Sequence, residues 1–225
     1  MLTEEQVDSY FENGQVTAPF KLSEEVIGAI QTKMEALFKS RPDLTPDYLP
    51  ALIEMDQSWL EFAMLPEILD IVEQLIGPDI IVWSSALFCK SPGQGKATPW
   101  HQDAQYWPIR PLETTTVWIA VDPSTQENGC LRVVPGSHLT GRIVEHSRNP
   151  GRHGSWTQVD ESRAVDLVIP AGTVVLFSAN LLHGAYDNHS NRTRYSTAWH
   201  YMPEELNPDR FPKGVYEDRH VARTH

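Results

Sequence analysis

The first third of the chain has the apolar spacing of amphipathic helices. After Ser23, a preferred N-cap residue, apolar side chains recur at intervals of three and four residues, at Val26, Ile27, Ile30, Met34, Leu37 and Phe38. Thr3 and Gln6 fit a capping box that begins a shorter helix, which Gly14 would end. A third helix is predicted between Pro66 and Gly77. Residues 39–58 contain several prolines and are expected to form an ordered loop.

Beyond Gly77 the pattern changes to short runs of β-branched and aromatic residues, separated by turn signals such as Ser91-Pro92-Gly93. These runs cover residues 80–90, 114–121, 129–134, 164–169, 173–177 and 195–202. Strands at this spacing, with no helices alternating between them, predict an antiparallel sandwich or barrel. Residues 140–163 interrupt the series, and a loop of this length is either disordered or functional, often as a lid.

No internal repeat, linker or low-complexity tract divides the 225 residues. We therefore expect one domain over residues 1–225 with a mainly β, jelly-roll body and flanking helices. Its parts would be a helical front at about 1–77, a β core at about 78–203 and a C-terminal tail at 204–225.

The charge balance narrows the classes of partner. The chain has 18 Lys and Arg against 30 Asp and Glu, a net charge of −12. Nucleic acids and anionic membranes both attract basic surfaces, so neither is an expected partner. No apolar run approaches the roughly 20 residues of a membrane span. Two cysteines form no disulfide framework, which favours a reducing, cytoplasmic location, whereas nothing in the sequence indicates an oligomeric state.

A candidate metal site begins at His101 and Asp103. Side chains at positions i and i+2 of an extended segment point to one side, so these two residues can face one divalent ion. A second histidine would complete a 2-His-1-carboxylate face, which leaves coordination positions open. Alone the pair is a weak signal, because a local hydrogen bond at a strand end explains it equally well. His183 follows a predicted strand, where a lone histidine is more often a core residue than a ligand.

Arg194 stands in a predicted strand among mostly apolar residues. A buried guanidinium needs a counter-charge, and its planar fork matches a carboxylate. The partner is either a small dicarboxylate ligand or an internal acidic side chain. Arg192 has the same strand parity, so alternation does not separate the two arginines. The other histidines are interpreted as surface or structural residues: His138, His146, His153, His189, His200, His220 and His225.

A set of short motifs between about Leu65 and Met202 is more specific than any one of them. The motifs are Leu65-Pro66-Glu67-Ile68-Leu69, Gly77-Pro78, Cys89-Lys90-Ser91-Pro92, Trp100-His101-Gln102-Asp103, Tyr106-Trp107-Pro108-Ile109-Arg110-Pro111, Asn128-Gly129-Cys130-Leu131, Val134-Pro135-Gly136-Ser137-His138, His183-Gly184-Ala185 and Arg194. In this order and at this spacing the chain resembles the phytanoyl-CoA dioxygenase family of Fe(II)- and 2-oxoglutarate-dependent oxygenases.

The resemblance implies a double-stranded β-helix with N-terminal helices packed on one sheet. It also implies that His101, Asp103 and His183 bind Fe(II). By family spacing Arg194, and not Arg192, would pair with the far carboxylate of 2-oxoglutarate.

Several further residues match family positions around the co-substrate. Trp118 and Ala86 match positions that line its pocket, although Trp118 would also suit core packing. Ala185 departs from the family, because many members carry a hydroxyl there; Ser196 could supply one instead. Tyr106 and Trp107 would line a substrate pocket or pack in the core, and the loop at 140–163 would cover the mouth of the site or be a solvated charged loop.

The expected activity is hydroxylation of an unactivated C–H bond in a small organic molecule, with O2 consumed and succinate and CO2 released. Desaturation and ring closure stay open, because the position of the substrate decides among them. Two alternatives are a non-catalytic β-helix protein that binds metal or ligand, and a cupin-type metalloenzyme that does not use 2-oxoglutarate.

Overall fold

The computed structural model describes residues 1–44, 47–107, 113–148, 155–206 and 220–224. The three helices expected from the sequence are present as α1 (Glu4–Asn13), α2 (Glu24–Ser40) and α5 (Pro66–Ile76). Thr3 and Gln6 form the complete capping box of α1, and Gly14 ends that helix with a φ of 80°. Two further helices, α3 (Leu52–Met55) and α4 (Leu60–Ala63), are a single turn long.

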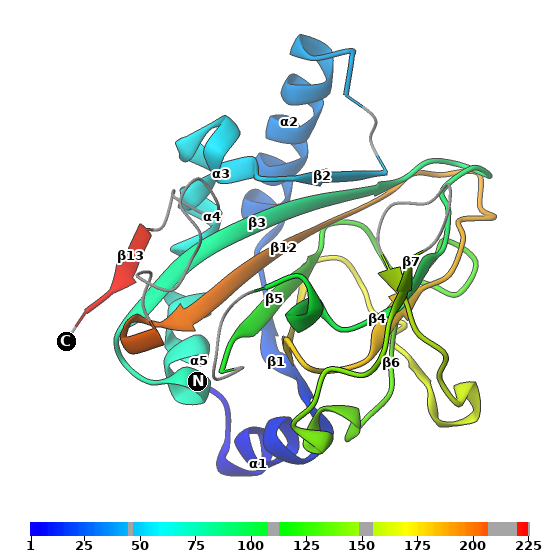
Figure 1. Cartoon of the computed structure of the whole chain (residues 1–225). Coiled ribbons are helices and arrows are strands. Elements are labelled where there is room, and N and C mark those ends of the chain that lie inside the picture. Colours follow the sequence, from blue (N-terminus) through cyan, green and yellow to red (C-terminus); the bar gives the residue numbers. More distant parts are fainter. Residues whose placement is uncertain (45–46, 108–112, 149–154, 207–219, 225) are drawn as a thin grey trace.

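Most strands belong to a seven-stranded antiparallel sheet, called here the major sheet. Its order is β1-β10-β5-β12-β3-β13, with β2 also paired to β3. The bounds are β1 (Gln15–Lys21), β2 (Tyr48–Pro50), β3 (Ile80–Lys90), β5 (Thr115–Ala120), β10 (Thr173–Ser178), β12 (Arg194–Pro203) and β13 (His220–Arg223). The long pair β3 and β12 crosses the whole molecule (Figure 1).

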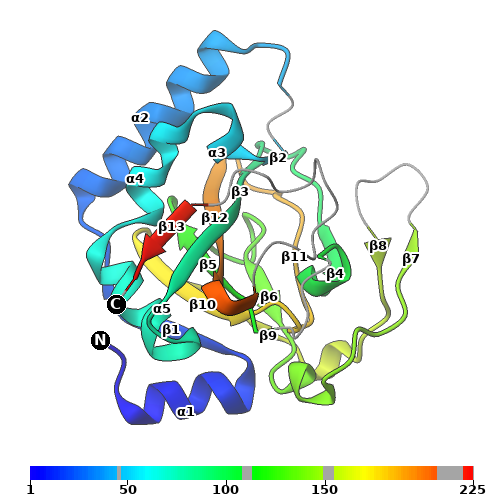
Figure 2. The ribbon, with the colours of Figure 1, turned by 60° about the vertical axis from the view of Figure 1, so that its left-hand side comes forward.

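A four-stranded sheet, the minor sheet, faces the major one (Figure 2). Its order is β4-β11-β6-β9, with bounds β4 (Thr98–His101), β11 (His183–Ala185), β6 (Leu131–Val133) and β9 (Val165–Asp166). β7 (Ser147–Arg148) pairs antiparallel with β8 (Ser155–Trp156) in a separate two-stranded sheet. Two facing antiparallel sheets make the double-stranded β-helix that the sequence predicted.

Strand alternation gives the major sheet two different apolar faces. Its outer face packs against α2, α4 and α5, which lie together on one side of the sheet in Figure 2. Its inner face packs against the minor sheet through residues that include Trp118, Val175, Phe177 and Ala198, together with Leu131 and Val133 of β6. The space between the sheets is therefore the interior in which a site can be enclosed.

Several segments differ from the secondary structure expected for them, including the expected loop at 140–163, which contains β7 and β8. The helical front contains β1, an edge strand beside β10; the register shifts between Thr17 and Lys21, around Pro19, which has no N–H to donate. Residues 39–58, expected as a loop, contain β2 and α3. The C-terminal tail contains β13, which pairs with β3.

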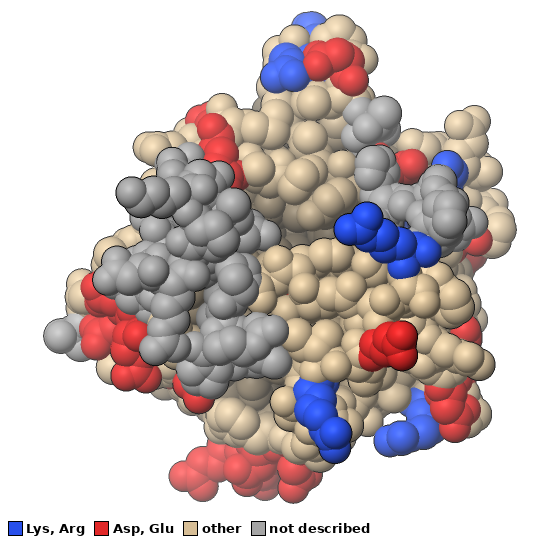
Figure 3. All heavy atoms as spheres, viewed as in Figure 1, with Lys and Arg blue, Asp and Glu red and all other residues tan. Residues whose placement is uncertain are grey.

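Acidic side chains gather at the lower edge of the face in Figure 3, over α1, which carries Glu4, Glu5, Asp8 and Glu12. The middle of that face is largely uncharged. Within the described residues, no helix combines the length and the apolar character needed to traverse a membrane.

Candidate active site

Two histidines meet where neighbouring strands of the minor sheet pair. His101 ends β4, His183 begins β11, and the two residues are directly opposite each other, with ring centroids 4.2 Å apart. Gly184 allows the strands to approach this closely, because a Cβ there would lie 2.9 Å from the carbonyl oxygen of Thr98. The pairing of β4 with β11 thus brings together side chains that are distant in sequence.

Asp103 joins the histidines from a 3-10 turn, η2 (Asp103–Gln105), that follows β4. Gln102 keeps the chain extended as far as this turn, with φ −115° and ψ 130°. The N–H of Ala104 donates to the carbonyl of Ala179 over 2.9 Å, which fixes the turn against the segment before His183. The possible ligand atoms of His101, Asp103 and His183 all lie within 4.8 Å of one another.

Backbone carbonyls decide which nitrogen of each imidazole is free. The Nδ1–H of His101 donates to the carbonyl of Pro99 over 2.8 Å, and that of His183 donates to the carbonyl of Leu181 over 3.0 Å. The lone pair of each ring is therefore on Nε2, and the two Nε2 atoms lie 3.4 and 3.6 Å from Oδ1 of Asp103. Two neutral imidazole nitrogens and one carboxylate oxygen directed at one point fit a divalent metal ion such as Fe(II).

The protonation states of Asp103 and His183 suit metal binding as well. Burial alone would raise the pKa of Asp103, but the imidazoles of His183 and His101 hold it well below its ordinary value. Burial lowers the pKa of His183 to about 4. Burial also opposes a charge on His101, but contact with Asp103 outweighs it and raises the pKa of that imidazole. The carboxylate is thus ionised at neutral pH, as a metal ligand must be.

Arg194, at the start of β12, points into the interior without an acidic partner. Its side chain is 2% exposed, it forms no ion pair with any described residue, and its Nε has no hydrogen-bond partner. One contact is polar, from Nη1 to Oγ of Ser196 over 2.9 Å, and the ring of Trp118 lies 5.6 Å from the guanidinium carbon. An unpaired buried guanidinium is costly, so this arrangement fits an anionic ligand. Arg192 is exposed and lies outside the strand.

Comparison with known proteins agrees with this geometry. The family model described as Phytanoyl-CoA dioxygenase (PhyH) matches residues 10–196. The chain belongs to the phytanoyl-CoA dioxygenase family. Its match to the peroxisomal phytanoyl-CoA dioxygenase of Mus musculus is 30% identical and covers 89% of this chain and 68% of the mouse protein. The match to the Homo sapiens protein, at 33% identity, covers 65% of this chain and 46% of that protein, so the chain spans about half of its length.

Other relatives have different named reactions. L-proline trans-4-hydroxylase of Streptomyces griseoviridis is 26% identical over 82% of this chain and 81% of that protein. The crystal structure of SnoK, titled a non-heme alpha-ketoglutarate-dependent carbocyclase, superposes with a TM-score of 0.73 at 27% identity and covers 90% of this chain and 84% of SnoK. These findings confirm the predicted family, fold and enzyme class, a non-haem iron oxygenase that uses 2-oxoglutarate.

Three central strands of the major sheet carry neighbouring residues on the same face as Arg194. Ala198 of β12 pairs with Trp118 of β5 on one side and with Ala86 of β3 on the other. Alternation places all three on the inner face, which Arg194 and Ser196 share. Trp118 and Ala86 therefore share a face with Arg194, and Ser196, suggested as the replacement for a hydroxyl at Ala185, accepts a hydrogen bond from Arg194.

Tyr106 and Trp107 follow the metal group but differ in their surroundings. Tyr106 is 42% exposed, its ring centroid lies 6.2 Å from that of His101, and its hydroxyl accepts a hydrogen bond of 2.7 Å from the N–H of Ser155. Trp107 is buried edge-on against Trp83, with centroids 4.7 Å apart. The motif continues through residues 108–111, which lie outside the described residues.

The segment predicted as a long loop, residues 140–163, is anchored beside the metal group. Oε1 of Gln102 accepts from the N–H of Val144 over 2.8 Å, and the N–H of Gln102 donates to Nε2 of His146 over 3.1 Å. Residues 149–154 of this segment lie outside the described residues. Whether the segment acts as a lid stays a prediction.

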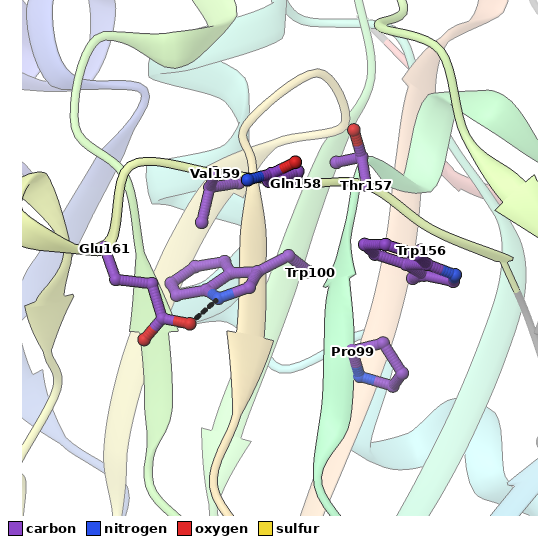
Figure 4. A pocket seen from close by; sticks show the side chains of 7 residues that line it. All are labelled: Pro99, Trp100, Trp156, Thr157, Gln158, Val159 and Glu161. Carbon is purple, nitrogen blue, oxygen red and sulfur yellow. Dashed lines mark hydrogen bonds between the residues drawn. The ribbon is translucent and has the colours of Figure 1, made fainter.

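A pocket lies beside β4, close to the metal group but built around Trp100 (Figure 4). Alternation directs Trp100 to the side of β4 opposite to His101, where its Nε1 donates to Glu161 over 3.2 Å and the guanidinium of Arg132 lies 5.0 Å from its ring. The pocket is lined by Pro99, Trp100, Trp156, Thr157, Gln158, Val159 and Glu161. It is thus distinct from the interior that Arg194 faces.

One further buried histidine lies beside the site. His200, interpreted from the sequence as surface or structural, is 8% exposed and hydrogen-bonded to Thr116, which also bonds Asp103. The sequence did indicate its orientation: His200 lies six residues after Arg194, and an even spacing along a strand places both side chains on the same face.

Proposed function

We propose that this chain hydroxylates a C–H bond of a small organic molecule, with 2-oxoglutarate converted to succinate and CO2. His101, Asp103 and His183 would hold Fe(II), and Arg194 with Ser196 would hold the far carboxylate of 2-oxoglutarate. The observation that carries this proposal is the convergence of three ligand atoms in an interior that also contains an unpaired buried guanidinium.

The bound iron and 2-oxoglutarate supply the oxidising chemistry, and the chain supplies position and shielding. The carbonyls of Pro99 and Leu181 orient the two imidazoles. Phe177, whose ring centroid lies 4.7 Å from that of His183, covers one side of the metal group with apolar surface. Arg194 would orient the co-substrate by two parallel hydrogen bonds, and Trp118 and Ala86 would pack against it.

The substrate is proposed to be a small molecule, since relatives are named for such substrates and products. Tyr106 and Trp107 are proposed to lie along its path, supported by their position next to the metal group. We propose a cytoplasmic location, based on two buried cysteines that form no disulfide, and no nucleic-acid partner, based on the net charge of −12. Residues 1–225 are proposed to form one domain.

The test is reconstitution with Fe(II), 2-oxoglutarate and O2 against a panel of small acids, amino acids and acyl thioesters, with succinate as the readout. Arg194→Ala should raise the 2-oxoglutarate concentration needed for half-maximal rate by at least about 10-fold, because a charged hydrogen bond contributes roughly 1.5–3 kcal/mol. Arg192→Ala is the matched control and should leave that concentration unchanged.

Each alternative gives a different result in the same assay. Absence of succinate across the panel would favour a non-catalytic binding protein. Turnover that is indifferent to 2-oxoglutarate and to Arg194 would indicate a cupin-type metalloenzyme. Mass spectrometry of the product then separates hydroxylation, which adds one oxygen atom, from desaturation or ring closure, which removes two hydrogens.

A further inference from the structure

A hydrogen-bonded chain runs from the metal group into the major sheet. Oγ1 of Thr116 lies 3.0 Å from Oδ2 of Asp103 and 3.1 Å from Nδ1 of His200. Thr116 in β5 and His200 in β12 are direct cross-strand partners, and both are buried. The expected metal ligands all lie outside the major sheet. The two hydrogen bonds of Thr116 therefore connect that sheet to the metal group.

Only one arrangement of protons satisfies both hydrogen bonds. An ionised carboxylate accepts but cannot donate, so the single hydroxyl proton of Thr116 must point to Asp103. The oxygen of Thr116 can then only accept from the other side, so His200 must carry its proton on Nδ1. A His200 tautomer protonated on Nε2 would compete with Asp103 for the hydroxyl proton.

Aromatic packing fixes the position of the His200 ring. Its ring centroid lies 4.7 Å from that of Trp107 and 5.8 Å from that of Trp83. Burial lowers the pKa of His200 to about 4, so the ring is neutral at pH 7. Two indoles therefore fix the plane of a neutral imidazole whose Nδ1 faces Thr116.

The two carboxylate oxygens of Asp103 consequently have different environments. Oδ1 faces Nε2 of both His101 and His183, whereas Oδ2 is held by Thr116. A carboxylate held in this way offers one oxygen to a metal, and the coordination position that its second oxygen would occupy is kept open.

We propose that Thr116 and His200 are positioning residues that hold Asp103 as a one-oxygen metal ligand, with His200 acting through the hydroxyl of Thr116. This inference rests on the proposed function, because it assigns a role around the same metal group. Neither residue touches the metal in this proposal. Both act by fixing the direction of a single carboxylate.

The test is Mn(II) affinity, measured by electron paramagnetic resonance of the free ion, with no turnover required. Thr116→Val keeps the shape of the side chain but removes the hydroxyl, and it should weaken Mn(II) binding by about 10- to 100-fold, as losses of hydrogen bonds to metal ligands do. Thr116→Ser restores the hydroxyl and should restore the affinity. Thr115→Val is the matched control: it removes a buried hydroxyl whose partners, Tyr10 and Phe177, are not metal ligands.

His200 is tested by rescue and by a double-mutant cycle. His200→Phe should weaken Mn(II) binding, whereas His200→Asn, whose amide N–H can take the place of Nδ1–H, should bind nearly as the parent does. Because His200 acts through Thr116, adding His200→Phe to Thr116→Val should cause no further loss.

The outcomes separate this inference from the proposed function. Failure of the parent protein to bind Mn(II) would remove the metal site and the proposed function with it. Binding by the parent, together with equal affinity in Thr116→Val, would leave the function standing and overturn the inference. Losses from His200→Phe that add fully to those from Thr116→Val, or equal losses in Thr115→Val, would also overturn it.

Discussion

At the scale of single residues, the interior of the β-helix is defined by buried cations. Arg194 pairs across the strands with Lys90, the last residue of β3, and both are nearly inaccessible to solvent. The ammonium of Lys90 donates to the carbonyl of Lys96. Burial, with a smaller contribution from the charge of Arg194, lowers the pKa of Lys90 to about 7. Burial and the neighbouring guanidinium thus disfavour the charged form of Lys90, whereas Arg194 keeps its charge.

The pKa of Lys90 predicts a particular dependence of stability on pH. Between pH 7 and about 10.4, the ordinary pKa of lysine, the unfolded chain holds a proton on Lys90 that the folded chain has lost, so this residue makes stability rise with pH. The slope should approach about 1.4 kcal/mol per pH unit in that window and vanish below it. Lys90→Met should remove this slope.

Urea unfolding of the parent and of Lys90→Met between pH 6.5 and about 9.5 measures the difference, with the pH range set by the shifted and ordinary pKa values. The exposed Lys96, substituted by Met, is the control and should run parallel to the parent. A difference in free energy of unfolding between the parent and Lys90→Met that stays constant over the range would contradict the prediction.

At the scale of elements, the contact between β4 and β11 determines whether the metal group forms. Gly184→Ala would place a Cβ 2.9 Å from the backbone oxygen of Thr98, and a backbone atom cannot turn aside as a side chain can. We expect the two strands to separate, which moves His101 away from His183. Mn(II) affinity should fall by more than about 10-fold, because metal sites tolerate only small shifts of their ligands. Unchanged affinity would show that the close approach of these strands is not required.

Gly28, within α2, offers the opposite case. A Cβ added at Gly28 meets no atom within 4 Å, and the backbone there is helical. Gly28→Ala should therefore raise the free energy of unfolding by about 0.5–1 kcal/mol through reduced freedom of the unfolded chain. Because α2 packs on the outer face of the major sheet, Mn(II) affinity should not change, which makes this variant a control for Gly184→Ala. Loss of stability in urea unfolding would contradict the assignment of an open position.

At the scale of the whole molecule, the two sheets contribute different parts of the site. The minor sheet carries His101 and His183, and the major sheet carries Arg194 and Thr116. A metal with bound 2-oxoglutarate would therefore bridge the sheets. We expect Mn(II) at about 100 times its Kd to raise stability by about 2.7 kcal/mol, with a further rise when 2-oxoglutarate is added.

Thermal unfolding checks this coupling. Arg194→Ala should keep the rise caused by Mn(II) and lose the rise caused by 2-oxoglutarate. In the parent, 2-oxoglutarate without metal should have little effect, since one of its ends would then lack a partner. An equal effect of 2-oxoglutarate with and without Mn(II) would show that the two ligands bind independently.

Some of this molecule follows from local sequence alone. The capping box at Thr3, the periodicity after Ser23 and the β-branched run at residues 80–90 each produced the expected element, because caps and apolar periodicity act over a few residues. The spacing of His101 and Asp103 placed two possible ligands side by side for the same reason. The strand β1 was missed, because its short run is interrupted by Pro19 and is held by pairing with the distant β10.

Only the tertiary structure decided which segments that are far apart in the sequence come into contact. Arg192 and Arg194 have the same parity, and only family spacing favoured Arg194 from the sequence. Their burial differs because β12 begins at Arg194, while Arg192 lies in solvent. The parity of His200 with Arg194 indicated its face of the strand, but only cross-strand pairing set it opposite Thr116. Local sequence fixes helix caps, strand periodicity and short-range ligand pairs, because their energies depend on neighbouring residues. Burial, hydrogen-bond partners and the charge that a side chain faces depend on which distant strands pair, and those pairings exist only once the chain has folded.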